Sequence, residues 1–158
     1  MIKQIISNCN SNNDKFECLK KMIDDDITII ENAIFTEPDD QSAWWYLQFL
    51  FSYIMKQINL FENNNDTDTN ENIMEYKQWF IELLLKQIEL SKSLLEVEES
   101  CKWPMITIVN IIGILLKIEN NYNIDNNDSI KEERDCYIMK LIDLDPTHRN
   151  RYFYLLNN

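Results

Sequence analysis

The stretch FTEPDDQSAWWYLQFLF, Phe35 to Phe51, places an acidic, proline-containing turn directly before an almost entirely apolar run. Pro38 stops the preceding helical pattern, and Asp39 or Asp40 can cap the next helix by accepting hydrogen bonds from its free N–H groups. The apolar residues after the turn recur at helical spacing and form one stripe: Trp44, Leu47, Phe51, Ile54, Met55 and Ile58. Because Trp45, Phe49 and Tyr53 widen this stripe, we expect the helix to be covered on most sides. The stretch predicts a helical hairpin closed by an acidic turn.

Glycine content supports an all-α fold for the whole chain. The 158 residues include one glycine and three prolines. An all-β protein needs many Gly-containing turns, and a nucleotide-binding α/β protein needs Gly-rich loops. A chain of this length can bury roughly 68–70% of its unfolded surface, so a substantial core is expected.

The helical patterns are separated by turns and by two Asn-rich stretches, residues 59–72 and 120–128, which we predict to be loops. Trp44, Trp103 and Tyr152 each follow an acidic or Pro-containing turn, at separations of 59 and 49 residues. Ser129 and Glu132 have the spacing of a capping box. These features predict a single domain, residues 1–158, of antiparallel helical hairpins stacked as an α-α superhelix.

Catalytic and metal-binding signatures are absent from the sequence. There is one histidine, His148, and the four cysteines are widely spaced, so we expect no catalytic, metal-binding or cofactor-binding residues in this chain. A net charge of −12 argues against nucleic-acid binding. The longest apolar run, Pro104–Ile118, is too short to span a bilayer. The wide spacing of the cysteines, with no CxxC pair, suits reduced thiols, and together with the lack of a signal-peptide pattern it suggests a cytoplasmic protein.

The aromatic residues that follow the turns have two open interpretations. They can be core residues that lock helix pairs together, or anchors at the surface where a partner chain docks. Polar side chains stand beside them at Tyr46, Gln48, Arg149 and Arg151. We therefore select as candidate repeat-motif or partner-interface residues Trp44, Tyr46, Gln48, Trp103, Arg149 and Tyr152.

Pro38–Leu50, PDDQSAWWYLQFL, resembles the repeat of protein prenyltransferase α subunits, in which a Pro-acid turn precedes Ser-Ala-Trp-x-Tyr-x-Arg. The form of this segment is most similar to the α subunit of Rab geranylgeranyltransferase, the type II enzyme. Glu89–Val109 and Leu141–Tyr152 are similar to later repeats of that family, in the same order. Gln48 stands where the repeat has Arg, and Glu99 stands where the second turn has Pro.

The resemblance implies the C-terminal part of a crescent of helical hairpins that wraps a β subunit. It also implies that zinc and geranylgeranyl diphosphate bind to the β subunit, with none in this chain. The enzyme would transfer geranylgeranyl to C-terminal cysteines of Rab GTPases presented by an escort protein, and this chain alone would be inactive. Two alternatives stay open: an α subunit shared by farnesyltransferase and geranylgeranyltransferase type I, and a free-standing helical-repeat interaction module.

Overall fold

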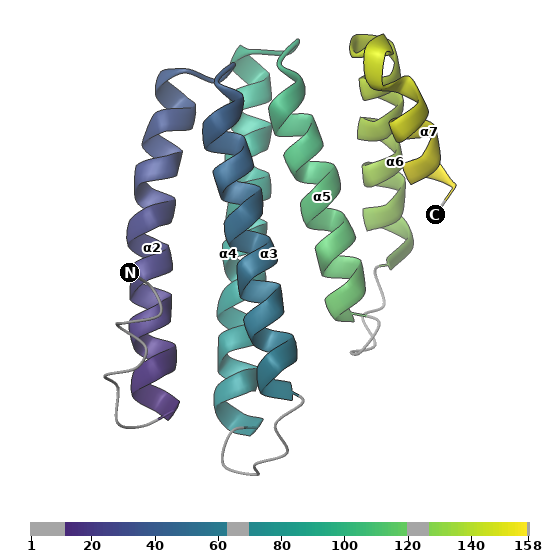
Figure 1. The fold of residues 1–158 in the computed structure, drawn as a ribbon. Helices are drawn as coiled ribbons and strands as arrows, with labels where there is room; N and C mark the ends of the chain where they lie inside the picture. Colours follow the sequence, from purple (N-terminus) through teal and green to yellow (C-terminus); the bar gives the residue numbers. More distant parts are fainter. Residues whose placement is uncertain (1–11, 63–69, 120–126, 158) are drawn as a thin grey trace. The chain divides into compact units, whose positions relative to one another are not determined.

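The computed structural model describes residues 12–62, 70–119 and 127–157, and these residues are almost all helical (Figure 1). The helices are α2 (Asn12–Thr36), α3 (Gln41–Glu62), α4 (Asn70–Val97), α5 (Lys102–Glu119), α6 (Asn127–Leu144) and α7 (Arg149–Leu156), with a 3₁₀ turn, η2 (Pro146–His148), before α7. The described ranges contain no strand. The prediction of an all-α fold is confirmed.

The chain divides into two compact units, residues 1–81 and residues 82–158. The division falls within α4, so this helix contributes its first turns to unit 1 and the remainder to unit 2. Each unit has buried apolar residues of its own.

Unit 1 is built around the hairpin of α2 and α3 (Figure 1). The buried residues of α2 recur every three or four positions and form one stripe: Phe16, Leu19, Ile23, Ile27, Ile30 and Ile34. The buried stripe of α3 contains Trp44, Leu47, Leu50, Phe51, Ile54 and Ile58. Phe51 meets Phe80 of α4 with ring centroids 6.3 Å apart. The hairpin predicted from the opening stretch is therefore present, with its apolar stripe buried.

The helices reach further into the first Asn-rich stretch than the sequence suggested. Helix α3 continues to Glu62 and α4 begins at Asn70, whereas the predicted loop covered residues 59–72. Phe61 packs on Phe16 with ring centroids 4.4 Å apart, and Glu62 accepts a hydrogen bond from the buried amine of Lys77. These contacts hold the last turn of α3 in place. Residues 63–69 lie outside the described part of the chain.

Unit 2 is organised around α5, α6 and α7. Its cluster of buried residues joins all three helices through Met105, Val109, Ile138, Leu141, Ile142 and Tyr152. Helix α5 is buried along most of its length, as its nearly continuous apolar sequence predicts. Pro104 lies in the first turn of α5, where its missing N–H leaves no intrahelical bond unmade. The α5–α6 packing therefore supplies much of the core of this unit.

The predicted capping box at Ser129 and Glu132 does not mark the start of α6. The helix begins at Asn127, inside the predicted loop 120–128, so Ser129 lies within the first turn. Residues 120–126 are outside the described ranges. Asn127 and Asp128 belong to the residue types that favour helix N-termini, and they precede Ser129 in the chain.

None of the helices in the described parts of the chain combines the length and the apolar character needed to cross a membrane.

Candidate functional site

Three interhelical turns share one backbone register. We call them turn A (Glu37–Asp40), turn B (Glu98–Cys101) and turn C (Asp145–His148). In each turn the N–H of the first residue donates to the carbonyl four residues earlier, at 2.9 Å in turn A, 2.8 Å in turn B and 2.9 Å in turn C. The N–H of the fourth residue donates back to the carbonyl of the first, at 3.1, 3.0 and 3.1 Å respectively. The helix that follows starts at the next residue in every case.

The sequence of these turns suits this geometry. The first residue is acidic each time, Glu37, Glu98 or Asp145, and proline follows it in turns A and C. Proline is favoured at the second position of such a four-residue turn because its φ angle is already set near the required value. Glu99 takes this position in turn B. The three turns are structural repeats with partly different residues.

In turn A one of the two predicted caps is formed, and Trp44 is hydrogen-bonded to the turn. The carboxylate of Asp40 accepts from the backbone N–H of Ser42 at 2.9 Å, and hydrogen bonds from Ser42 lower the pKa of Asp40. Trp44 is 1% exposed, and its indole Nε1–H donates to the carbonyl of Pro38 at 2.8 Å. Trp44 is therefore a core residue that holds α3 against its own turn.

In turn C a buried carboxylate gathers three donors. Asp145 Oδ2 accepts from Lys102 Nζ at 3.1 Å and from the hydroxyl of Tyr152 at 3.0 Å, and His148 Nδ1 lies 3.0 Å away. Lys102 is the first residue of α5, immediately after turn B, so this amine connects turn B to turn C within unit 2. The Asp145 cluster, defined as these four residues, is a structural junction between two turns.

The electrostatics of the Asp145 cluster follow from its burial. Burial by itself raises the pKa of Asp145, but the hydrogen bonds from His148, Lys102 and Tyr152 outweigh it, and the net pKa lies below the usual value. Burial and the hydrogen bond to Asp145 raise the pKa of Tyr152 to about 12. Tyr152 is therefore a neutral donor at physiological pH, and Asp145 is a charged acceptor.

The turn register changes the assignment of the second repeat. Trp44 and Tyr152 each lie seven residues after the first residue of their turn, and the equivalent residue after turn B is Met105. Met105 is buried in the core cluster of unit 2, whereas Trp103 is half-buried with the Lys102 amine 5.3 Å from its ring centroid. The anchor of the second repeat is thus Met105. Sequence reasoning missed it because Trp103 is the more conspicuous residue, although the spacing from Glu98 could have revealed it.

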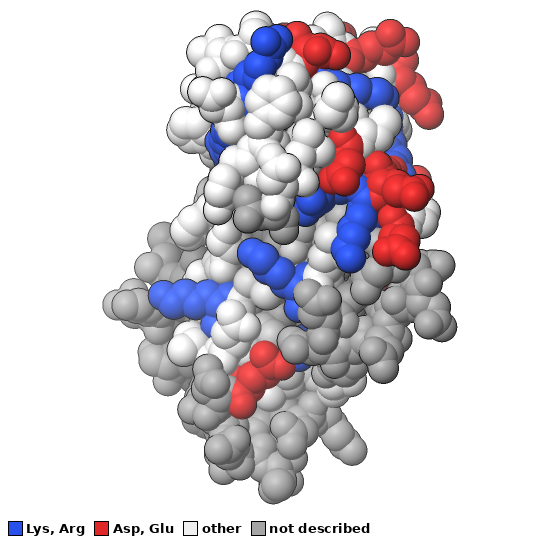
Figure 2. Space-filling view, turned by 90° about the vertical axis from the view of Figure 1, so that its right-hand side faces the viewer, with Lys and Arg blue, Asp and Glu red and all other residues white. Residues whose placement is uncertain are grey.

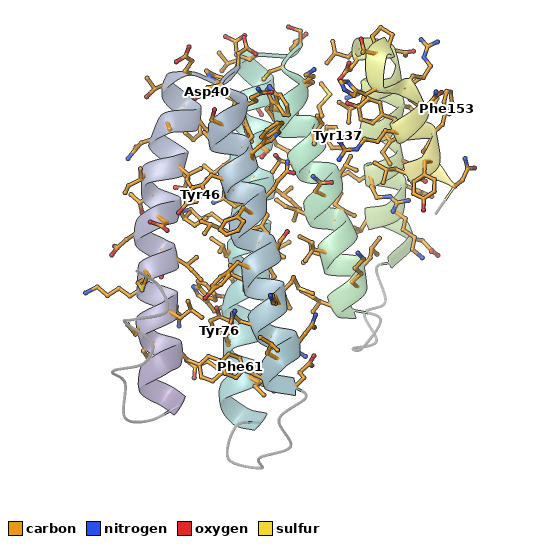
Figure 3. The ribbon with its side chains drawn as sticks, viewed as in Figure 1. Asp40, Tyr46, Phe61, Tyr76, Tyr137 and Phe153 are labelled. Atoms are coloured by element: carbon orange, nitrogen blue, oxygen red, sulfur yellow. The ribbon has the colours of Figure 1, made fainter. Side chains whose placement is uncertain are left out.

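Tyr46 and Gln48, the other candidates on α3, differ in exposure. The hydroxyl of Tyr46, which is 43% exposed, donates to Asp26 Oδ2 of α2 at 3.0 Å (Figure 3). Burial and this hydrogen bond raise the pKa of Tyr46. The side-chain amide nitrogen of Gln48 is buried and has no hydrogen-bond partner among the described residues.

Helix α3 also carries a row of aromatic rings, of which Tyr46 and Phe49 are exposed and Tyr53 is half-buried. The rings of Tyr46 and Phe49 are stacked with centroids 6.1 Å apart, and those of Phe49 and Tyr53 with centroids 6.4 Å apart. Trp45, on the same helix, is 59% exposed. The expectation that α3 is covered on most sides is wrong for the described residues, because the widened part of its apolar stripe faces solvent.

Arg149, the last of the sequence candidates, is exposed at the start of α7. Of the six candidates, the structure brings none together with another in a shared pocket. Trp44 and Tyr152 hold separate turns, Trp103 lies near Lys102, and Tyr46 and Arg149 are exposed. Their role in binding a partner stays a prediction.

An open pocket of about 620 Å³ lies in unit 2, a size suited to small ligands or to a few side chains of a partner. Helices α4, α5 and α6 and turn B contribute its lining: Leu95, Glu99, Met105, Tyr137, Lys140, Asp143 and Leu144. The Lys140 amine lies 5.3 Å from the centroid of the Tyr137 ring (Figure 3). The lining of the pocket combines apolar side chains with charges of both signs.

The described parts of the chain are residues 12–62, 70–119 and 127–157. These ranges contain no group of three or more His, Cys, Asp or Glu side chains that could hold a metal ion. Cys101 is buried, Cys18 is half-buried and Cys136 is exposed. Cys9 lies outside the described ranges.

Comparison with curated proteins identifies relatives with this helical sequence. The chain is 33% identical over 137 residues to the geranylgeranyl transferase type-2 subunit alpha of Dictyostelium discoideum, covering 86% of this chain and 34% of that protein. The chain resembles type-2 geranylgeranyl transferase α subunits. The subunits of the same name from Schizosaccharomyces pombe and Saccharomyces cerevisiae are 26% and 28% identical to it, over 84% and 87% of this chain.

The resemblance to the geranylgeranyl transferase type-2 α subunit, inferred from the repeat motifs, is therefore confirmed. The chain spans about a third of the length of these curated relatives. No family model matches the chain, and no solved structure matches it at a significant level.

Proposed function

We propose that this chain forms part of the α subunit of a type-2 protein geranylgeranyl transferase and acts there as a helical scaffold for a separate β subunit. The observation that carries the proposal is the similarity to three type-2 α subunits over about 85% of the chain. The helical hairpins closed by turns A, B and C agree with the repeat motif on which the resemblance rests.

In this proposal the chemistry belongs to the β subunit. Zinc and geranylgeranyl diphosphate bind there, and the geranylgeranyl group is transferred to C-terminal cysteines of Rab GTPases presented by an escort protein. The described residues of this chain contribute no metal site. Trp44 and the Asp145 cluster fix the helix ends, and the exposed rings of α3 are available to a partner. The complex acts in the cytoplasm, and this chain alone is inactive.

The test replaces the matched segment of the Dictyostelium α subunit with this chain and co-expresses the chimaera with the Dictyostelium β subunit. We expect a one-to-one complex that transfers labelled geranylgeranyl to a Rab GTPase when the escort protein is present. A folded chimaera that does not bind the β subunit would contradict the proposal. A chimaera carrying Trp44→Ala is the control for a disturbed repeat.

The same assay distinguishes the type-2 enzyme from the alternative enzymes, farnesyltransferase and geranylgeranyltransferase type I. An α subunit shared by farnesyltransferase and geranylgeranyltransferase type I would support transfer to short C-terminal peptides without an escort protein when paired with those β subunits. All three relatives named above are type-2 subunits, which favours the type-2 assignment. An interaction module serving another partner would bind neither kind of β subunit.

A further inference from the structure

Helix α7 differs in charge from the rest of this acidic chain. Residues 146–158 contain no Asp or Glu, although the chain has a net charge of −12. Arg149 and Arg151 are both exposed, and neither forms an ion pair with any residue in the described ranges. The two arginines are two residues apart, about 200° around the helix, so they stand on opposite edges of the exposed side of α7.

The same helix exposes two aromatic side chains. Phe153 is 45% exposed and Tyr154 is 67% exposed, and Phe153 extends away from the helix into solvent (Figure 3). Figure 2 views the molecule from the side on which α7 lies, and charged side chains of both signs surround uncharged surface in its upper part. Exposed aromatic and arginine side chains are the types that contribute most to protein–protein binding.

The turn register shows that the positions eight and nine residues after the first residue of a turn carry exposed aromatic side chains more than once, because after turn A they are Trp45 and Tyr46, 59% and 43% exposed. Phe153 and Tyr154 lie eight and nine residues after the first residue of turn C, and the equivalents after turn B are Ile106 and Thr107. Ile106 packs against the core cluster of unit 2 and Thr107 is buried. Where the chain itself covers these two positions, the residues are not aromatic. On α7 the chain does not cover these two positions, and the residues there are aromatic.

Two hydrogen bonds on the buried side of α7 fix the position of the helix. Tyr152 is buried and donates to Asp145, and Arg134 of α6 donates to the carbonyl of Leu155 at 3.2 Å. The helix is thus held at its middle and near its C-terminal end in the absence of a partner. A preorganised surface loses little conformational entropy on binding.

We propose that the face of α7 formed by Arg149, Arg151, Phe153 and Tyr154 is a docking surface for an acidic segment of a partner protein that also carries apolar side chains. Carboxylates of the segment pair with the two guanidinium groups, and its apolar side chains cover the two rings. The proposal stands independently of the proposed transferase role, because it is carried by the charge and exposure of α7.

Two other occupants fit the surface less well. Recruitment to anionic lipids uses clusters of about four to eight basic residues, and α7 supplies two. Nucleic acid would meet the repulsion of a chain whose net charge is −12. A protein segment needs few charges if it also buries apolar surface.

The test measures binding of the full chain to two fluorescein-labelled synthetic peptides by fluorescence anisotropy. Both peptides have about eighteen residues with leucine and phenylalanine at helical spacing, and they differ only in carrying glutamate or lysine on the flanks. We expect the glutamate peptide to bind at least about ten-fold more tightly, against the direction set by the net charge. Equal or tighter binding of the lysine peptide, or no binding of the glutamate peptide, overturns the proposal.

Variants assign the binding to α7. We expect the double variant Arg149→Glu with Arg151→Glu to bind the glutamate peptide about ten-fold or more weakly than the wild type does. The matched control, Lys56→Glu with Lys131→Glu, changes net charge equally at exposed lysines outside α7 and should alter binding by less than about two-fold. Phe153→Ala, which leaves the charge unchanged, should weaken binding about five-fold. Equal effects of the two charge-reversal pairs overturn the proposal.

Sedimentation equilibrium tests whether a second copy of the chain binds this surface, and binding to phosphatidylserine vesicles tests whether anionic lipid does. A dimer of the wild-type chain that Phe153→Ala dissociates, or vesicle binding that needs Arg149 and Arg151 while the glutamate peptide does not bind, also overturns it. Because the substituted side chains are exposed, all variants should keep the wild-type circular dichroism spectrum.

Discussion

The hydroxyl of Tyr152 donates a hydrogen bond to Oδ2 of Asp145, seven residues earlier in the chain, at 3.0 Å. The same oxygen accepts from Lys102, 43 residues earlier than Asp145. One carboxylate therefore joins the last helix of unit 2 to the start of α5. The stability of that junction can be measured directly.

A double-mutant cycle tests the Tyr152–Asp145 bond. Tyr152→Phe removes one donor and should lower the free energy of unfolding by about 0.5–1.5 kcal/mol. Asp145→Ala leaves the buried hydroxyl unpaired and should cost about 1–3 kcal/mol. The double variant should cost less than the sum, because the first change removes the bond that the second would break. Urea denaturation gives all three values, and strict additivity would contradict the contact.

The control for this cycle is Asp143→Ala. Asp143 lies in the last turn of α6, two residues before Asp145, but is exposed, so its loss should change the free energy of unfolding by less than about 0.5 kcal/mol.

The stability of the protein should depend on the charge of Asp145 at acid pH. The folded-state pKa of Asp145 lies below its usual value of 3.8, so its contribution to stability is complete above that value and is lost as the pH falls through the lower folded-state pKa. We expect the wild type to be more stable than Asp145→Asn at pH 7, and the difference to shrink below about pH 4. Urea midpoints between pH 7 and about pH 2.5 measure it. A difference that stays constant over this range would show that the charge of Asp145 contributes nothing.

Trp44 and Trp45 are adjacent in sequence but should respond differently to the same substitution. Trp44→Phe removes the hydrogen bond to the Pro38 carbonyl and leaves unfilled space in the core, so it should cost about 1–3 kcal/mol. Trp45→Phe alters an exposed ring and should change stability by less than about 0.5 kcal/mol. Thermal unfolding followed by circular dichroism compares the two. Equal losses would mean that the burial of Trp44 is not what stabilises turn A.

Glu99→Pro should stabilise the protein. Glu99 occupies the position that proline takes in turns A and C, and a proline that fits the native backbone restricts the unfolded chain. We expect a gain of about 0.4–1 kcal/mol in the free energy of unfolding. Ser100→Pro is the matched control: proline is disfavoured at the third position of such a turn, so this variant should be destabilised. A loss of stability in Glu99→Pro would show that turn B does not share the backbone geometry of the other two.

Several local features could be predicted from the sequence because their determinants are neighbours in the chain. Pro38 and Asp40 predicted the end of α2 and the start of α3, and the Asp40–Ser42 hydrogen bond confirms the cap. The acidic, Pro-containing turn expected before Tyr152 is likewise present, as turn C. Turn chemistry acts over a few residues, so a single sequence is enough to show it.

Other features depend on contacts between distant residues. No periodic pattern connects Lys102 to Asp145, which are 43 residues apart in the chain. The width of the apolar stripe on α3 suggested burial of Trp45 and Phe49, yet both are exposed. An amphipathic pattern shows which residues are apolar. It does not show whether other residues of the same chain bury them.

None of the described residues has a positive φ angle, so turns A, B and C are made entirely from conformations open to any amino acid with a side chain. The feature that the three turns share is then a pattern of two backbone hydrogen bonds. No single residue is indispensable to this pattern. A lineage of such hairpins can exchange most of its side chains while the backbone path persists. This freedom fits relatives that share 26–33% of their residues with this chain.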